Sequence, residues 1–277
     1  SVPLVADIHF DYRLALMCIE RGISKIRINP GNIGGEDRAA AVAKAAKAKG
    51  ITIRIGVNGG SLEKGLLEKC GGNLAMAMVE SAKRHIDILN RYDFDDIVLS
   101  MKSSDVRTTI AAYRLAHESF NYPLHLGVTE AGTVKSGIIK SSIGIGSLLA
   151  DGIGDTIRVS LTGDPVKEVE AARLILRALD MEPDSIQVVS CPTCGRTKID
   201  LISIANRVTE ETEKLKGKLK VAVMGCVVNG PGEAKDADIG IAGGDGCAVL
   251  FKKGEIIKKL PENEIVDALM DEIRRMI

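Results

Sequence analysis

Short apolar runs rich in β-branched residues alternate with longer stretches of helical periodicity up to about residue 180. Strands that alternate with helices along a chain predict βαβ units and a parallel sheet, and six such units can be placed. The predicted strands span 3–8, 25–30, 51–57, 96–102, 124–130 and 156–161, and the predicted helices span 11–21, 36–49, 73–91, 104–119, 134–150 and 165–180.

A different pattern begins after Glu182-Pro183-Asp184, which predicts a domain boundary between 1–182 and 183–277. The elements beyond it include a glycine-rich turn and a hairpin, which is typical of a smaller α+β domain. They are a strand that ends at Cys191, a helix at 199–215, strands at 219–225 and 238–242, a hairpin at 247–259 and an amphipathic helix at 262–276.

Length and charge narrow the class of protein. A chain of 277 residues suits two domains. With 37 cationic and 37 anionic side chains the formal net charge is zero, which argues against a general binder of nucleic acid or membrane surfaces but allows a local basic pocket. No apolar run approaches the roughly 20 residues of a membrane span, and the first residues lack the features of a signal peptide. Six cysteines without a secretion signal fit a reducing cytoplasm.

Polar residues interrupt the predicted strands, mostly near their carboxyl ends and often two positions apart. Side chains two apart on a strand point to the same side, which in a barrel is inward at the mouth, where active sites of such barrels lie. The pairs are Asp7 with His9, Arg27 with Asn29, Arg54 with Asn58 and Arg158 with Ser160, and Lys102 and Glu130 end the two other strands.

Four of these residues are cations, and they come from four separate strands. Without an anionic ligand they would repel one another, so we predict a substrate with several negative charges, most simply phosphates. The alternative is that each cation forms an ordinary ion pair at a strand end. Convergence of all four at one barrel mouth favours the pocket, and His9 lies beside it, where a proton-transfer role stays open.

Three cysteines and one glutamate form a candidate metal site. Cys191 and Cys194 flank a turn, and Cys226 and Glu233 lie in a second, glycine-rich turn. Thiolates favour an iron–sulfur cluster or zinc, and a weaker carboxylate ligand would leave one iron open to substrate. A structural zinc site is the alternative, although its usual second cysteine pair is missing here.

The remaining cysteines and histidines receive no functional role. Cys18, Cys70 and Cys247 stand apart from the turns, His125 starts a strand and is predicted to be structural, and the helical residues His85 and His117 are predicted to lie on the surface.

Together these segments resemble the 4-hydroxy-3-methylbut-2-enyl diphosphate synthase family, iron–sulfur enzymes of the methylerythritol phosphate route to isoprenoids. The resemblance covers essentially the whole chain. It is carried by VADIHFDYRLAL, KIRINPGNIG, IRIGVNGGSL, LGVTEAG, IRVSLTGDP, SCPTCGRT and GCVVNGPGE, which occur in the family's order.

The resemblance implies a [4Fe–4S] cluster held by Cys191, Cys194, Cys226 and Glu233. It also implies that 2-C-methyl-D-erythritol 2,4-cyclodiphosphate binds in a barrel of the dihydropteroate-synthase type and is reduced there. Our candidate proton donor near the reacting carbons is Glu130, and the alternative is that it only orients a ligand hydroxyl. Electrons are expected from flavodoxin or ferredoxin, and the family implies a homodimer. The family positions that contact substrate match Arg27, Asn29, Arg54, Asn58, Lys102, Thr129, Glu130, Arg158, Ser160 and Asn229.

The chain departs from the family at its N-terminus. The family has a preceding stretch with two further β/α units and another phosphate-binding arginine, so we expect an α/β fold in which six of eight units of a TIM-type barrel precede a smaller α+β cluster domain. The predicted activity therefore belongs to the intact protein. Two rival functions are a zinc-stabilised barrel that binds a phosphorylated or pterin-like ligand without redox chemistry, and an electron-transfer module, for which a basic barrel mouth has no use.

Overall fold

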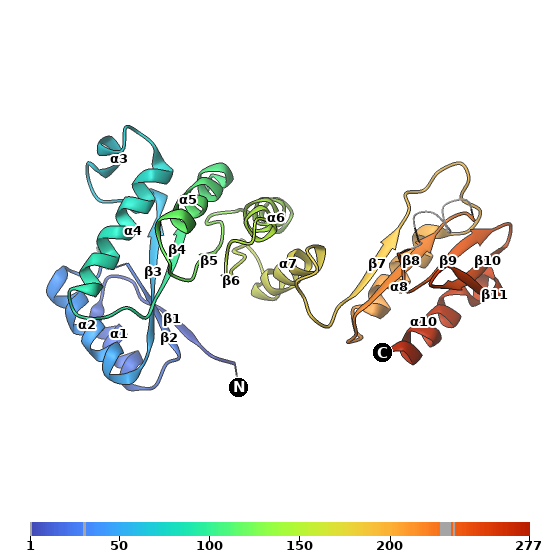
Figure 1. The fold of residues 1–277 in the computed structure, drawn as a ribbon, viewed down its shortest axis with the longest axis horizontal. Helices are drawn as coiled ribbons and strands as arrows, with labels where there is room; N and C mark the ends of the chain where they lie inside the picture. The colour runs from blue at the N-terminus through green and yellow to red at the C-terminus, as the bar shows by residue number, and fades with distance from the viewer. Residues whose placement is uncertain (1, 30–31, 228–233, 235) are drawn as a thin grey trace. The chain divides into compact units, whose positions relative to one another are not determined.

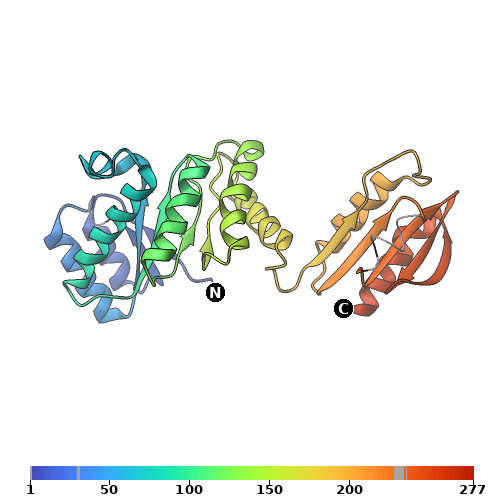
Figure 2. The same cartoon turned by 45° about the horizontal axis from the view of Figure 1, so that its top comes forward.

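The computed structural model describes residues 2–29, 32–227, 234 and 236–277, and it divides into two compact units, Ser1–Leu179 and Asp180–Ile277 (Figure 1). In each unit helices pack against β-strands, as the turned view in Figure 2 also shows. The alternating elements predicted from the sequence are present, and the parallel α/β architecture is confirmed. No helix in the described part of the chain is long and apolar enough to cross a membrane.

The first unit contains parallel strands that follow one another in chain order. Strands β1 to β4 form one sheet, β5 and β6 form another, and a single bridge between Leu99 and Leu124 joins β4 to β5. The elements are β1 (Val5–Asp7), α1 (Tyr12–Glu20), β2 (Lys25–Ile28), α2 (Glu36–Lys49), β3 (Thr52–Asn58), η1 (Gly59–Ser61), α3 (Leu66–Lys69), α4 (Leu74–Asn90), β4 (Ile97–Lys102), α5 (Val106–Ser119), β5 (His125–Leu126), α6 (Val134–Ala150), β6 (Thr156–Ile157) and α7 (Pro165–Ala178).

Two of the predicted strands were too long. The segments at 124–130 and 156–161 shrink to the two-residue strands β5 and β6. Beyond Leu126 the chain no longer pairs regularly with β4, and Glu130 adopts a left-handed backbone conformation with a φ of 51°, which a continuing strand does not allow. Val128 is still buried although it lies beyond the end of β5. An apolar run therefore predicts burial correctly but does not show where the strand ends.

Side-chain caps set where the helices begin after the strands. Asp105 accepts a hydrogen bond from the Thr108 amide at 2.7 Å, and Asp164 accepts one from the Val166 amide at 2.9 Å with Pro165 at the first helical position. Such caps satisfy amides that the first helical turn leaves free. They fix the starts of α5 and α7 close to the carboxyl ends of β4 and β6.

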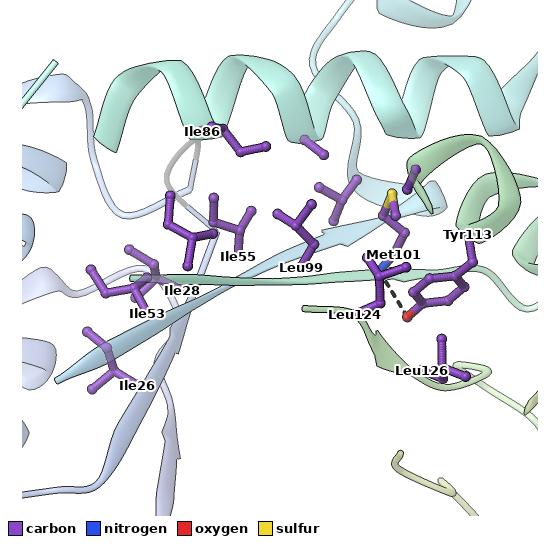
Figure 3. Close-up of a cluster of buried hydrophobic side chains, with 14 of the residues drawn as sticks. Ile26, Ile28, Ile53, Ile55, Ile86, Leu99, Met101, Tyr113, Leu124 and Leu126 are labelled. Carbon is purple, nitrogen blue, oxygen red and sulfur yellow. Dashed lines mark hydrogen bonds between the residues drawn. The ribbon is translucent and has the colours of Figure 1, made fainter. Parts of the chain in front are cut away.

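The strands of the first unit have one apolar face and one polar face. Ile53, Ile55, Leu99 and Met101 point to the apolar face and belong to one buried cluster with Ile86 of α4 (Figure 3). Full burial of one such side chain contributes about 1.5–3 kcal/mol. Because successive side chains alternate, this packing directs the residues between them to the opposite face.

The second unit is a five-stranded sheet in the order β11-β10-β9-β8-β7. Strands β7, β8 and β9 are parallel, and β10 and β11 form the predicted antiparallel hairpin. Its elements are β7 (Ile186–Ser190), α8 (Leu201–Thr212), β8 (Leu219–Met224), β9 (Ile239–Gly244), β10 (Cys247–Lys252), β11 (Glu255–Pro261), η2 (Glu262–Glu264) and α10 (Ile265–Met276). Helices α8 and α10 contact each other and pack against the sheet. A separate apolar core lies between these helices and the strands.

Candidate functional site

A cavity of about 210 Å³ lies at the carboxyl ends of the strands of the first unit. We call it the cationic cavity, because four of its lining side chains are cationic. It is lined by Asp7, His9, Arg27, Arg54, Asn58, Ser100, Lys102, Thr129, Arg158 and Ser160.

Strand register places the charged groups in a row. Asp7 is paired with Arg27 across β1 and β2, and Arg27 is paired with Arg54 across β2 and β3. Partners in a parallel ladder point to the same face of the sheet, here the polar one. Asn58 and Lys102 form a second pair across β3 and β4, nearer the carboxyl ends of these strands.

Glycine makes room for one of these cations. A Cβ atom on Gly56 would lie 2.1 Å from Nε of Arg27, so any side chain at this position would displace the guanidinium group. Arg27 can therefore lean across β3 only because residue 56 has no side chain.

Asp7 is the counter-ion of the cationic cavity. Its Oδ1 atom lies 3.0 Å from Nη1 of Arg27, and its Oδ2 atom lies 3.5 Å from Nη1 of Arg158. The Nε2 atom of His9 is 3.5 Å from the same carboxylate. Among the described residues that line the cavity, one carboxylate faces four cations, which leaves an excess of positive charge that an anionic ligand would neutralise.

Burial and mutual repulsion lower the pKa values of two of these cations, Lys102 and Arg54. Burial, together with the nearby cations Arg158, Arg54 and Arg27, lowers the pKa of Lys102 to about 7 against the opposite effect of Asp7. Burial also lowers the pKa of Arg54, whose Nε atom is buried without a hydrogen-bond partner in the described structure. A ligand that offers acceptor oxygens would satisfy this atom and restore the charge on Lys102.

A second cavity of about 390 Å³ adjoins the first and shares Asn58 and Thr129 with it. We call it the hydroxyl cavity, since serine and threonine hydroxyls, an amide and one carboxylate provide its polar side chains. It is lined by Asn58, Gly59, Gly60, Ser61, Leu74, Ser103, Ser104, Thr129 and Glu130. Glu130 thus lies beside the cationic cavity and not in its lining, and its left-handed backbone is a strained conformation of the kind found at functional sites.

Asn29 is the one predicted substrate residue of the first unit that lines neither cavity among the described residues. It is buried after the end of β2, and its carbonyl accepts a hydrogen bond from the Asn32 amide at 2.9 Å. Asn229, which was predicted from the second unit, lies outside the described residues.

Two of the predicted metal ligands follow neighbouring parallel strands of the second unit. Cys191 comes directly after β7 and Cys226 comes two residues after β8, so both lie at the same edge of the sheet. The Gly225 amide donates a hydrogen bond to Sγ of Cys191 at 3.2 Å, and the Gly225 carbonyl accepts one from Lys198 at 3.3 Å. Amides aimed at sulfur are typical of thiolate sites that hold metal clusters.

Cys194 lies in the exposed turn that follows Cys191. A backbone hydrogen bond from Arg196 lowers the pKa of the Cys194 thiol and favours the thiolate. Glu233 lies outside the described residues, and among those that are described no group of three or more histidine, cysteine or acidic side chains is arranged to hold a metal ion. The donor chemistry and the paired strand ends nevertheless fit a thiolate-ligated cluster.

Two family descriptions match this chain, the GcpE TIM-barrel domain over residues 1–173 and the GcpE protein C-terminal domain over residues 187–275. The chain belongs to the GcpE family. The resemblance that the sequence motifs indicated is thereby confirmed.

Relatives within the GcpE family carry the name 4-hydroxy-3-methylbut-2-en-1-yl diphosphate synthase (flavodoxin). The protein of this name from Ruminiclostridium cellulolyticum is 61% identical over 276 residues, which cover 100% of this chain and 78% of the relative. The one from Clostridium acetobutylicum is 62% identical and is covered to 79%, and the one from Geobacillus thermodenitrificans is 57% identical and is covered to 74%.

The structure adds residues to the GcpE site that the sequence did not assign to it. Ser100 lines the cationic cavity, and a signal for it was available because it stands two positions before Lys102 on the same strand. Ser61, Ser103 and Ser104 line the hydroxyl cavity, and no spacing pattern in the sequence distinguishes them from ordinary loop serines.

One histidine prediction was wrong. His85 is buried under the loop that follows β3, with its Nε2 atom 3.3 Å from Oε1 of Glu63. It lies on the inner side of α4, which the helical pattern alone did not reveal. His117 is exposed as predicted, and the structural role predicted for His125 fits its burial and the 2.8 Å contact between its Nδ1 atom and Oγ1 of Thr156.

Proposed function

We propose that this chain carries out the reaction for which its relatives are named. It converts 2-C-methyl-D-erythritol 2,4-cyclodiphosphate into 4-hydroxy-3-methylbut-2-enyl diphosphate in isoprenoid biosynthesis, by reductive ring opening and loss of water. The observation that carries this proposal is the convergence of four cationic side chains on one cavity with a single carboxylate as counter-ion. Such an excess of positive charge suits a ligand with two phosphate groups.

The cations hold and neutralise the diphosphate. Arg27 and Arg54 offer planar guanidinium groups that can bind phosphate oxygens in pairs, and Lys102 provides a point charge at the end of β4. The ring C–O bond breaks with the diphosphate as leaving group, so negative charge grows on an oxygen that these side chains already face. Charge stabilisation prepared in advance is a major contribution to catalysis.

The hydroxyl cavity suits the uncharged part of the substrate. Asn58 and Thr129 lie in both cavities and would bind hydroxyl groups next to the phosphates. Glu130, which lines the hydroxyl cavity next to Thr129, is the proposed donor of the proton with which the departing hydroxyl forms water.

We infer that Cys191, Cys194 and Cys226 hold a [4Fe–4S] cluster and that Glu233 is its fourth ligand. When bound, such a cluster would supply, one at a time, the two electrons that the ring opening consumes. The residues of the chain provide soft thiolate ligands, an amide directed at one sulfur and a carboxylate that can yield its position.

The electron donor, the oligomeric state, the cellular compartment and the complete barrel belong to the same proposal. Flavodoxin, which is part of the names of the relatives, is the proposed electron donor, with ferredoxin as the alternative. We further propose a homodimer, a reducing cytoplasmic environment for the thiolates, and a barrel in which the six units seen here belong to a set of eight.

Anaerobic purification of the natural full-length protein tests the function. We expect iron and inorganic sulfide, together with formation of the allylic diphosphate from the cyclic diphosphate under reducing conditions. Arg54→Ala should raise the KM at least tenfold, whereas Lys44→Ala, on the exposed side of α2, should leave it unchanged. A colourless protein that contains zinc and no iron would overturn the proposal in favour of a zinc-stabilised ligand-binding barrel.

A further inference from the structure

The hydroxyl group of Tyr113 connects strands β4 and β5. Tyr113 belongs to α5, and its side chain is fully buried. The Met101 amide donates a hydrogen bond to the tyrosine oxygen at 3.1 Å, and the hydroxyl donates one to the His125 carbonyl at 2.5 Å. Figure 3 shows the first of these bonds. The tyrosine therefore acts on the main chain of both strands at once.

The two main-chain groups are the ones that a regular ladder would join directly. Strands β4 and β5 form a parallel bridge at Leu99 and Leu124. In a parallel ladder the pattern of hydrogen bonds repeats every two residues, so the next bond would run from the Met101 amide to the His125 carbonyl. The Tyr113 hydroxyl takes the place of that bond, and two groups bridged by an oxygen atom must lie farther apart than two groups in direct contact.

The separation of the strands occurs next to Lys102. This residue follows Met101, and its Cε and Nζ atoms come so close to Gly127 that a Cβ atom there would lie 3.0 Å from each of them. The chain segments meet again beyond this point, where the Thr129 amide donates to the Ser103 carbonyl at 3.3 Å. The opening is thus local, and it coincides with the place where the lysine side chain enters the cationic cavity.

The tyrosine is protonated when it forms this bridge. Burial raises the pKa of Tyr113 far above its usual value, although hydrogen bonds from Ser100, Met101 and Gly127 act in the opposite direction. A neutral hydroxyl can both accept from one main-chain group and donate to the other, which phenylalanine cannot do.

We propose that Tyr113 is a positioning residue for Lys102: its hydroxyl holds β4 and β5 apart and so makes space for the lysine to reach the substrate phosphates. The inference rests on the proposed function for the identity of the phosphate-bearing ligand. Without the hydroxyl, the Met101 amide and the His125 carbonyl either pair directly or stay unsatisfied, and in both cases the geometry around Lys102 changes.

The test compares Tyr113→Phe with Tyr122→Phe in the full-length, cluster-loaded protein. Tyr122 also donates its hydroxyl hydrogen bond to an acceptor, the Asp95 carboxylate, but that contact lies outside both cavities. For Tyr113→Phe we expect the Kd for inorganic pyrophosphate and the KM for the cyclic diphosphate to rise at least tenfold, with kcat changed less than threefold. The Tyr122→Phe variant should stay within twofold of wild type in all three.

A pH profile separates positioning from a general loss of stability. Pyrophosphate affinity in the wild type should begin to fall near pH 7, because Lys102 loses its proton there under the influence of Arg158, Arg54, Arg27 and Asp7. In Tyr113→Phe the pH at which affinity begins to fall, which we call the break, should move by at least half a pH unit. In Lys102→Met the break should vanish. Unchanged affinity together with an unchanged break in Tyr113→Phe would overturn the proposal.

A second variant covers the case in which Tyr113→Phe fails to fold. p-Aminophenylalanine at position 113 keeps both a donor and an acceptor near the position of the hydroxyl, so pyrophosphate affinity should stay within threefold of wild type; a tenfold loss would contradict the bridge. If the wild-type protein binds pyrophosphate but does not convert the cyclic diphosphate, the proposed function fails, while the comparison of pyrophosphate affinities still decides the role of Tyr113.

Discussion

The Oδ1 atom of Asp7 lies 3.0 Å from Nη1 of Arg27, at the end of the row of charged residues that crosses β1, β2 and β3. This pair neutralises one cation while the substrate is absent. A phosphate group that enters must compete with the carboxylate for the same guanidinium group. Asp7 therefore influences both the stability of the free protein and its affinity for anions.

Asp7→Asn is expected to destabilise the free protein, because Arg27 and Arg158 lose their shared counter-ion. Pyrophosphate should then raise the Tm more than it does in the wild type, since the bound anion replaces the missing charge. Thermal unfolding with and without pyrophosphate measures both effects. Asp93→Asn is the control, since Asp93 pairs with Lys47 on the surface, and an equal response of the two variants would exclude Asp7 as the counter-ion.

Pyrophosphate binding should take up protons above pH 7. Lys102 has a pKa lowered to about 7 by burial and by the neighbouring arginines, so it is largely neutral at pH 8 and must regain its charge next to a phosphate. Calorimetric titrations at pH 8 in two buffers of different ionisation enthalpy give the number of protons. We expect an uptake approaching one proton in the wild type and much less in Lys102→Met, and equal uptake in both would assign the proton to another group.

Gly127→Ala is expected to weaken anion binding at least tenfold. The added Cβ atom would lie 2.8 Å from the Arg158 carbonyl oxygen and 3.0 Å from Nζ of Lys102, so one of these groups must move. Gly146→Ala is the matched control, because a Cβ atom there meets no atom within 4 Å and lies within α6. Alanine in a helix should stabilise the fold by about 0.5–1 kcal/mol and leave pyrophosphate affinity unchanged.

Cys226→Ser should lose most of its iron and inorganic sulfide. Serine keeps the size of the side chain but offers a much poorer ligand for a cluster, next to the turn that holds Cys191. Cys247→Ser serves as the control, because Cys247 begins β10 and is not among the proposed ligands. Metal analysis of anaerobically prepared proteins distinguishes them, and full iron content in Cys226→Ser would contradict the ligand assignment.

The free energy of unfolding should depend on His85 at acid pH. Burial lowers the pKa of His85 although Glu63 raises it, so the folded state keeps the imidazole neutral while the unfolded chain protonates near pH 6.5. The unfolded state then binds more protons, and stability falls as the pH drops below 6.5, by up to about 1.4 kcal/mol per pH unit and proton. Urea unfolding at pH 5 and pH 7.5 should show a smaller pH effect in His85→Leu than in wild type, and His117→Leu, which alters an exposed residue, should match wild type.

Much of the site was accessible from local sequence patterns. The β/α alternation located the strands of the first unit. Polar residues on these strands, mostly near their carboxyl ends and often two positions apart, identified Arg27, Arg54, Lys102 and Arg158, all of which line one cavity. This works because a strand directs alternate side chains to opposite faces, and because the carboxyl ends of parallel strands meet at one edge.

Other parts depended on contacts between distant segments. Two predicted strands were too long because a hydrophobic run does not reveal where strand pairing stops. His85 was predicted to be exposed because the helical pattern says nothing about the loop with Glu63 that covers it. The hydroxyl cavity likewise brings together Ser61, which follows β3, with Ser103 and Ser104, which follow β4. These serines meet because the carboxyl ends of the two strands are adjacent in the sheet.

The sequence by itself determined the order of the elements, the family and the residue types available for chemistry, since these follow from periodicity and motifs along the chain. The tertiary structure alone decided that Asp7 faces two arginines, that Gly56 and Gly127 leave space for cations, and that Tyr113 stands between β4 and β5. The physical reason is that hydrogen bonds, charge interactions and steric exclusion act over a few ångströms in space, between residues that can be far apart in the chain.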